Sequence, residues 1–188
     1  MSIAVAVRTG KGIVIAADSQ SNWGSETADP RNHQAHKIMT IGESLVAMTG
    51  WSLYQDILLD YVKRLRRATL TDQLTIFSFF RDFWKALHED YAFVNDQCAE
   101  TDSPFGNLDS DFLVVNHSGI FAVSANMSVA TFERYHAIGS GCAYSLGALH
   151  VLYDEQADPA ALARKAVETA ITFSVYCGGT IEVHSVSA

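Results

Sequence analysis

The sequence is poor in the residues that cross-link or interrupt small proteins. Its 188 residues include only three prolines and three cysteines, Cys98, Cys142 and Cys177, which are widely spaced and form no C-x-x-C pair. An odd number of separated thiols makes no disulfide framework and fits a reducing, cytoplasmic environment. A chain of this length buries roughly 70% of its unfolded surface. We therefore expect one domain over residues 1–188 that needs neither disulfides nor a metal.

Long apolar runs and basic clusters are also scarce. No stretch approaches the roughly 20 apolar residues that cross a membrane, and the first residues lack the basic leader and apolar run of an export signal. The 13 basic residues are outnumbered by 21 acidic ones, for a net charge of −8. Because binding to nucleic acid or to anionic membranes depends on clustered Lys and Arg, neither is an expected partner.

Charged residues make up only 18% of the chain, whereas hydrophobic residues make up 48%. A surface that carries so little charge favours a subunit that covers part of itself with neighbouring copies. Composition thus points to a homo-oligomer.

Apolar periodicity divides the chain into blocks of strands and helices. An early hairpin and two further strands precede two helices, the first with a capping box at Ser52-x-x-Gln55, and a polar loop covers residues 19–34. The predicted strands are 2–7, 13–17, 37–41, 45–49, 111–116, 120–124, about 129–138 and 180–186; the predicted helices are 52–65, 71–95, 142–153 and one from Asp158–Pro159 onward. Segregated blocks of this kind predict an α+β fold. The aromatic stripe of the second helix, which includes Leu74, Phe77, Phe80 and Phe83, is interpreted as core.

Motifs for cofactors and metals are missing or weak. The sequence has no Walker loop, no G-x-G-x-x-G and no H-E-x-x-H. His33-x-x-His36 has no Cys or carboxylate at finger-like spacing, so we expect no metal. Cys142 opens an apolar helix and is better explained as a small buried hydrophobe than as a nucleophile.

Three polar residues at strand ends remain, namely Ser2, Asp18 and Lys37. Asp18 ends the buried second strand and Lys37 begins the third. Singly, Asp18 can cap a turn and Lys37 can lie on an edge. Together, a carboxylate and an ammonium that flank the first strand can surround its terminal amine.

Five segments in order resemble the proteasome β-subunits and the bacterial HslV peptidase. They are residues 13–19 (IVIAADS), 36–38 (HKI), 47–50 (AMTG), 139–141 (GSG) and 178–179 (GG). The resemblance spans essentially the whole chain and looks closest to the homomeric bacterial proteasome homologues. It implies the N-terminal-nucleophile (Ntn) hydrolase fold, an αββα sandwich of two antiparallel sheets between helix layers.

The resemblance also implies roles for eight residues. Ser2 falls where the family has its N-terminal threonine, Asp18 on its acidic residue and Lys37 on its active-site lysine. Gly50 matches the oxyanion-hole glycine, and Ser140 matches a serine that hydrogen-bonds near the amino terminus. Positions that line the substrate cleft correspond to Gln20, Asn22 and Met48, with Met48 in the primary specificity pocket.

The implied chemistry starts from a free α-amine. Removal of Met1 would place the hydroxyl and an amine of pKa about 7.7–8.0 on the same residue, so that the amine acts as general base. Lys37 would stabilise the alkoxide, Asp18 would orient Lys37, and the Gly50 N–H would stabilise the tetrahedral oxyanion by roughly 2.7–4 kcal/mol.

Two departures from the family pattern are visible. Ser2 lacks the threonine methyl group that restricts χ1, so we expect slower catalysis. Ser174 stands where the family has an aspartate and Cys177 where it has a serine, which weakens the surroundings of the amine.

The expected function is hydrolysis of peptides or unfolded protein inside stacked rings of identical subunits, with no cofactor and no metal. Met48 would favour medium-sized apolar side chains before the cut. An ATP-driven unfoldase is left open as a partner. Two alternatives also remain open: a non-catalytic ring or scaffold subunit, and a small-molecule amidohydrolase of the same fold.

Overall fold

The computed structural model describes residues 2–91, 108, 110–154 and 158–186. Met1 and the expected helical residues 92–95 lie outside this part of the chain. The helices are α1 (Ser52–Arg64), α2 (Gln73–Glu89), α3 (Cys142–Leu152) and α4 (Pro159–Phe173). The strands are β1 (Ile3–Thr9), β2 (Gly12–Asp18), β3 (Asn22–Trp23), β4 (Glu26–Thr27), β5 (Ile38–Ile41), β6 (Ser44–Gly50), β7 (Ser110–Asn116), β8 (Gly119–Val123), β9 (Val129–Phe132), β10 (Tyr135–Gly139) and β11 (Ile181–Ser185).

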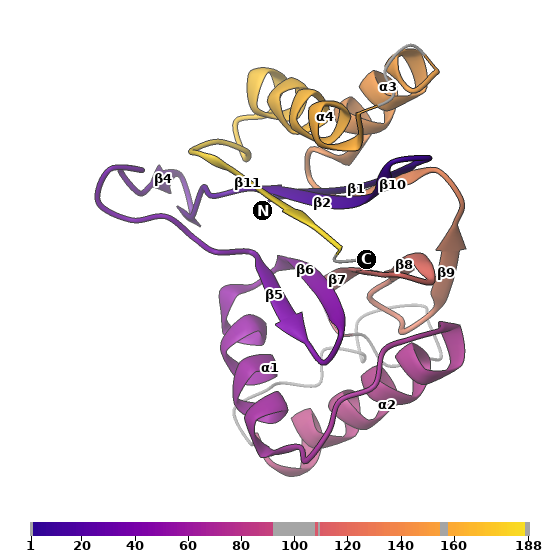
Figure 1. The fold of residues 1–188 in the computed structure, drawn as a ribbon. Helices are drawn as coiled ribbons and strands as arrows, with labels where there is room; N and C mark the ends of the chain where they lie inside the picture. Colours follow the sequence, from indigo (N-terminus) through magenta and orange to yellow (C-terminus); the bar gives the residue numbers. More distant parts are fainter. Residues whose placement is uncertain (1, 92–107, 109, 155–157, 187–188) are drawn as a thin grey trace.

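Two antiparallel sheets face each other in the middle of the molecule (Figure 1). The first has the strand order β10-β1-β2-β11 and contains the early hairpin, in which Ala4 pairs with Ala17. The second has the order β5-β6-β7-β8-β9. The short pair β3–β4 lies within the loop expected at residues 19–34.

Helices α3 and α4 cover the outer face of the first sheet, and α1 and α2 cover that of the second (Figure 1). A separate apolar cluster fills each of the three spaces between layers. Phe80 and Phe83 of α2 pack with Phe112 of β7 in the space between the helices and the second sheet. The space between the two sheets is filled by smaller residues such as Ala4, Ala6 and Ala17. The expected α+β, four-layer αββα sandwich is confirmed.

Two helix starts follow from their caps. Asp158, the residue before Pro159, is the N-cap of α4 as expected, and its side chain accepts a hydrogen bond from the Ala160 N–H. The capping box predicted at Ser52 and Gln55 is wrong, because Trp51 is the N-cap residue, without a side-chain cap, and Gln55 Nε2 instead donates to the His36 carbonyl. The reciprocal box occurs at α2, between Asp72 and Thr75.

The aromatic stripe of α2 is only partly core. Phe80 and Phe83 are fully buried, but Leu74 is 77% exposed and Phe77 is 43% exposed. Both lie on the outward side of the helix, so the interpretation of these two as core is wrong. The apolar face of α2 is narrower than the run of apolar residues in the sequence.

The strand expected at about 129–138 is two strands that belong to different sheets. β9 pairs with β8 in the second sheet, and after Glu133 and Arg134 the chain enters the first sheet as β10, beside β1. Periodicity alone does not reveal this corner, because the partner of β10 is β1, near the start of the chain. The chain therefore joins the two sheets covalently along one edge.

Among the helices of the described residues, none is long and apolar enough to span a membrane.

Candidate active site

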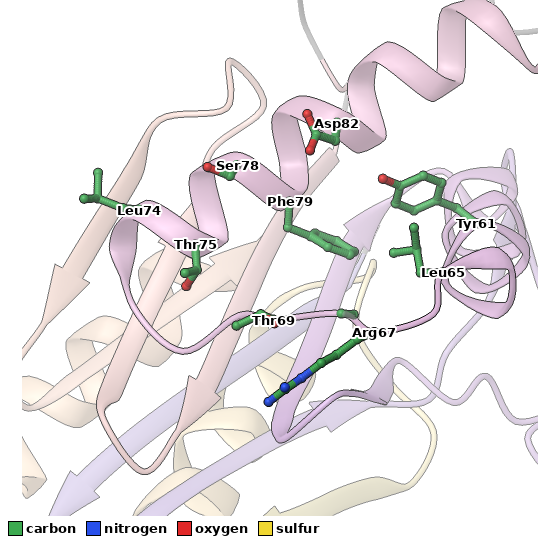
Figure 2. A pocket seen from close by; sticks show the side chains of 10 residues that line it. Tyr61, Leu65, Arg67, Thr69, Leu74, Thr75, Ser78, Phe79 and Asp82 are labelled. Carbon is green, nitrogen blue, oxygen red and sulfur yellow. The ribbon is translucent and has the colours of Figure 1, made fainter.

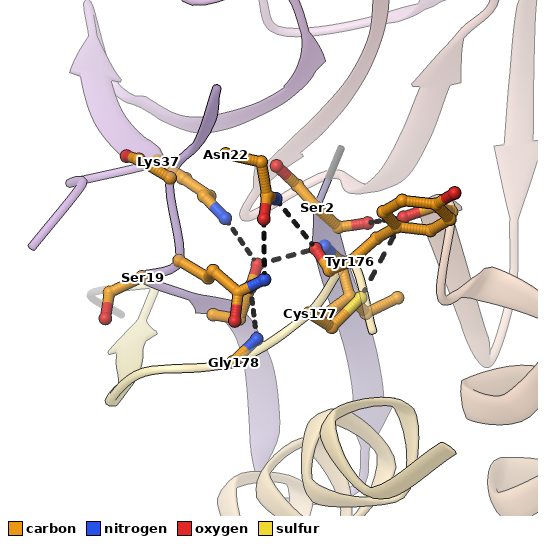
Figure 3. A network of polar contacts seen from close by, with 12 residues as sticks. Ser2, Ser19, Asn22, Lys37, Tyr176, Cys177 and Gly178 are labelled. Carbon is orange, nitrogen blue, oxygen red and sulfur yellow. Dashed lines mark hydrogen bonds and ion pairs between the residues drawn. The ribbon is translucent and has the colours of Figure 1, made fainter. Parts of the chain in front are cut away.

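The fully buried Asp18 carboxylate is the centre of a hydrogen-bond network (Figure 3). Its Oδ1 accepts from the Ile3 backbone N–H at 3.0 Å and from Lys37 Nζ at 2.6 Å, while its Oδ2 accepts from the Gly178 N–H at 2.9 Å. β1 and β2 pair antiparallel, which brings the start of β1 beside the end of β2. The register thus places Asp18 next to residue 2.

Lys37 is held in place from its own backbone as well as through its side chain. The Glu182 Oε1 atom on β11 accepts hydrogen bonds from the Lys37 N–H at 2.7 Å and from the Ile38 N–H at 3.1 Å. The imidazoles of His36 and His184 lie 3.7 and 3.6 Å from the second oxygen of Glu182. The Glu182 carboxylate therefore fixes the position of the Lys37 backbone. It also links β11, an edge strand of the first sheet, to β5, an edge strand of the second.

Ser2 lies between Asp18 and the turn after β10, and it is 6% exposed. Its carbonyl accepts a hydrogen bond from Ser140 Oγ at 3.3 Å and from the Gly141 N–H at 3.5 Å. Gly139 has φ +98°, and a Cβ there would collide with the Ser2 carbonyl oxygen and lie 2.9 Å from Thr49 Cγ2. Only glycine lets the turn approach residue 2 this closely.

A cavity of about 300 Å³ opens beside Ser2. Gly50, at the end of β6, and Ser140 form part of its wall together with Ser2. The lining also includes Ser110 and Asp111 at the start of β7, which pair with Gly50 and Thr49 on the neighbouring strand. The structure therefore brings Ser2, Asp18, Lys37, Gly50 and Ser140 together at one end of the sandwich.

The three residues expected in the substrate cleft lie elsewhere than in this cavity. Gln20 Nε2 donates to Asn22 Oδ1 at 2.8 Å and to the Val175 carbonyl at 3.0 Å, and Asn22 Nδ2 donates to the Tyr176 carbonyl at 3.3 Å. Both side chains therefore hold the segment after α4 (Figure 3). Met48 is 5% exposed and packs in the apolar cluster under α1 and α2.

The two departing positions stay close to this network. Ser174 is the C-cap residue directly after α4, and its hydroxyl accepts from the Tyr176 N–H at 3.4 Å. The Cys177 Sγ atom lies 3.9 Å from Ser140 Oγ, and burial raises the pKa of the thiol. Cys177 therefore lies beside the turn that holds Ser2.

A second cavity, of about 380 Å³, lies in the helix layer between α1, the linker after it and α2 (Figure 2). Tyr61, Arg67, Phe79 and Asp82 are among its lining residues, and none of them belongs to the Asp18 network. Within the described ranges, no group of three His, Cys, Asp or Glu side chains is arranged to hold a metal ion.

Known proteins resemble the chain over its full length. No protein-family model matches it. The Proteasome subunit beta of Nanoarchaeum equitans (strain Kin4-M) is 23% identical over 195 residues, which cover 100% of this chain and 93% of that protein. The bacterial proteasome homologue BPH of Thiobacillus denitrificans is 30% identical, with a TM-score of 0.87 and 98% of each chain covered. The chain belongs to the proteasome β-subunit family.

Two further solved structures are similar to the chain. The Thiobacillus denitrificans BPH in complex with epoxomicin matches with 30% identity, a TM-score of 0.86 and coverage of 99% of this chain and 100% of that one. The eukaryotic HslV from Trypanosoma brucei has 19% identity and a TM-score of 0.68, with 99% of each chain covered. At that identity the HslV likeness concerns the fold alone. As a proteasome β-type chain, the protein is a member of an Ntn protease family.

Three residues around Ser2 and Lys37 carry no recognisable signal in the sequence, namely Ser110, Asp111 and Glu182. Glu182 lies in the last expected strand, and no motif links it to Lys37 across 145 positions. Asp111 was expected only as the first residue of a strand, and Ser110 precedes that strand without an expected role. The pairing of β6 with β7 brings them opposite Thr49 and Gly50, and a single sequence carries no signal for that register.

Proposed function

We propose that the chain is an N-terminal-nucleophile peptidase that cuts peptide bonds in unfolded protein or peptides, with Ser2 as nucleophile. The observation that carries the proposal is the Asp18 carboxylate, which at once binds the N–H directly after Ser2 and the Lys37 ammonium. A buried carboxylate with a buried lysine at a strand end costs desolvation energy. Acyl transfer needs such a pair close to a nucleophilic hydroxyl, here that of Ser2, and to a backbone N–H that can bind the oxyanion, here that of Gly50.

In the proposed reaction, removal of Met1 frees the α-amine of Ser2. The amine takes the hydroxyl proton, and Oγ attacks the substrate carbonyl carbon to form a tetrahedral oxyanion beside the Gly50 N–H. The amine then passes its proton to the leaving nitrogen as the C–N bond breaks, which leaves an ester on Ser2. Water attacks that ester by the same proton route, releases the acid and restores the hydroxyl.

The other residues would position these groups. The hydrogen bonds from Ser140 Oγ and the Gly141 N–H to the Ser2 carbonyl would fix the orientation of the residue that carries both amine and hydroxyl. The Lys37 ammonium would stabilise negative charge on Oγ. The preference for medium apolar side chains before the cut, attributed to Met48, stays a prediction, and fluorogenic peptides that vary at that position test it.

We further propose that the chain self-associates into stacked rings. Support comes from its low share of charged residues and from the apolar side chains that α3, α4 and the segment after α4 leave in solvent, of which Val151, Phe173 and Val175 are all at least 65% exposed. Native mass spectrometry tests this, and a monomer at micromolar concentration would contradict it. A closed assembly also disfavours the small-molecule amidohydrolase alternative.

The decisive experiment is reaction of the full chain, produced without additions before Met1, with the epoxyketone epoxomicin. Intact mass first establishes whether Met1 has been removed, and peptide mapping then locates the adduct. We expect the adduct on Ser2, hydrolysis of fluorogenic peptides by the wild type and by Ser2→Thr, and loss of both adduct and hydrolysis in Ser2→Ala. A processed but unreactive protein would favour the non-catalytic scaffold subunit. An adduct on any other residue would refute the assignment of Ser2.

A further inference from the structure

The cavity beside Ser2 contains chemistry that the proposed reaction does not use. Its β7 wall presents Ser110 and Asp111, one strand away from the proposed oxyanion glycine. Gln20, Asn22 and Met48, which the family resemblance places along the substrate cleft, are not part of its lining. A substrate whose carbonyl lies against Gly50 therefore has a separate space for the part of the chain that leaves.

Asp111 has a carboxylate with spare binding capacity. Its Oδ1 atom accepts the Ala125 N–H at 3.1 Å, and the side chain is partly buried. Within the described part of the chain, no Lys, Arg or His pairs with it and its Oδ2 atom accepts no hydrogen bond. Burial raises the pKa of this carboxyl above its ordinary value of 3.8, with no neighbouring cation to oppose the shift.

Ser110 supplies a second polar atom without a partner in the same wall. The residue is 4% exposed, and its Oγ atom is buried with no hydrogen-bond partner among the described residues. Buried hydroxyls are normally satisfied by protein or water. Because Ser110 Oγ is closed off from solvent, a polar ligand in the cavity would meet the Asp111 carboxylate and not this hydroxyl.

We propose that this cavity is the subsite for the first residue after the scissile bond and that Asp111 selects a Lys or Arg side chain there. The inference rests on the proposed peptidase function and names a substrate class for the same site. An ammonium or guanidinium group would pair with Asp111 Oδ2, and the partial burial of the carboxylate strengthens that attraction relative to a pair in open solvent. An acidic side chain in the same position would be repelled.

The test uses internally quenched peptides that differ only in the residue after the cut, which is Lys, Gln or Glu. The full-length processed protein is assayed as wild type and as Asp111→Asn, a change that keeps an acceptor for the Ala125 N–H. The matched control is Asp82→Asn, which makes the same charge change on α2. A peptide with an aminocoumarin leaving group has no residue on that side, so its hydrolysis by the wild type reports the proposed peptidase function alone.

For the wild type we expect kcat/KM to fall from Lys to Gln to Glu, with Lys over Glu by about three- to ten-fold, the size expected for a partly buried ion pair. Asp111→Asn should bring that ratio close to one, whereas Asp82→Asn should keep it. Hydrolysis of the coumarin peptide with no charge preference would overturn the subsite and leave the peptidase standing. A preference that survives in Asp111→Asn would overturn it as well, and absence of all hydrolysis would overturn both proposals.

Discussion

The protein has two networks of carboxylates and cations that look alike in chemistry and differ in their place in the fold. At the strand ends, Asp18 and Lys37 meet at 2.6 Å with side chains 0% and 7% exposed. On the helix layer, Arg64 lies 2.9 Å from Asp60 and 3.5 Å from Asp90, and Tyr91 donates to Asp60 at 2.5 Å, all near or at the surface. Similar distances thus occur in two very different surroundings.

The comparison shows that burial, more than distance, decides what such a network does. Water solvates each member of the helix-layer network when its partner leaves, so exposed pairs contribute little to stability. The members of the Asp18 network have only one another, and each left alone would be an uncompensated buried charge. Assembly of the buried network therefore costs desolvation free energy, and its hydrogen bonds hold the geometry around Ser2 rigid.

Replacing Asp18 by Ala should have the largest effect. It leaves the Lys37 ammonium and the N–H groups of Ile3 and Gly178 buried without an acceptor, so we expect a loss of about 3–5 kcal/mol in the free energy of unfolding. Urea denaturation followed by circular dichroism measures it. A loss no larger than that of the surface variant Asp60→Asn would contradict the contrast between the two networks.

Glu182→Gln should weaken the link from the buried network to β11. The amide keeps an acceptor for the Lys37 and Ile38 N–H groups but removes the charge, so we expect a loss of about 1 kcal/mol in unfolding free energy, since charged acceptors make the stronger hydrogen bonds. If Glu182 positions Lys37, kcat for peptide hydrolysis should fall while KM stays near the wild-type value. A change in KM alone would indicate a different role.

Asp111 lies between the two extremes, and its pKa gives a pH test. Because burial raises the pKa in the folded state above 3.8, its contribution to stability is fully present below that value and is lost as pH rises through the folded pKa. Asp111→Asn lacks this dependence. Melting temperatures of both proteins from acidic to neutral pH should therefore show the variant gaining on the wild type as pH rises; a constant difference would contradict the raised pKa.

Asp60→Asn should have the smallest effect. The hydrogen bond from Tyr91 holds the pKa of Asp60 below its usual range, so its contribution exists above 3.8 and is lost as pH falls through the lower folded value. Because the side chain is more than half exposed and water can solvate it, we expect the urea midpoint at neutral pH to stay within experimental error. A clear shift would mean that the helix layer depends on this network.

Much of the fold could be predicted from periodicity and caps. The β1–β2 hairpin, the Asp158 cap and the segregated blocks of strands and helices were all readable because they are local patterns. What could not be read is how strands meet. The corner between β9 and β10 and the register of β6 on β7 depend on contacts that lie far apart in the sequence.

The same division applies to the site. Ser2, Asp18 and Lys37 stood out because polar residues at strand ends next to apolar runs are conspicuous, and the family resemblance suggested a role for each. Glu182 and Asp111 did not stand out, because a charged residue within an edge strand or at a strand start has many ordinary explanations. Their importance comes from the residues across the sandwich that they face.

The corner between β9 and β10 and the carboxylate of Glu182 fasten the two sheets along opposite edges, one by covalent chain and one by hydrogen bonds. The two sheets are therefore linked at both edges, so neither edge can open without breaking one of these connections. Amide protons of β1 and β7 should then exchange with deuterium at a common rate set by global unfolding. Removal of the Glu182 carboxylate should let the amide protons of the first sheet exchange sooner than those of the second.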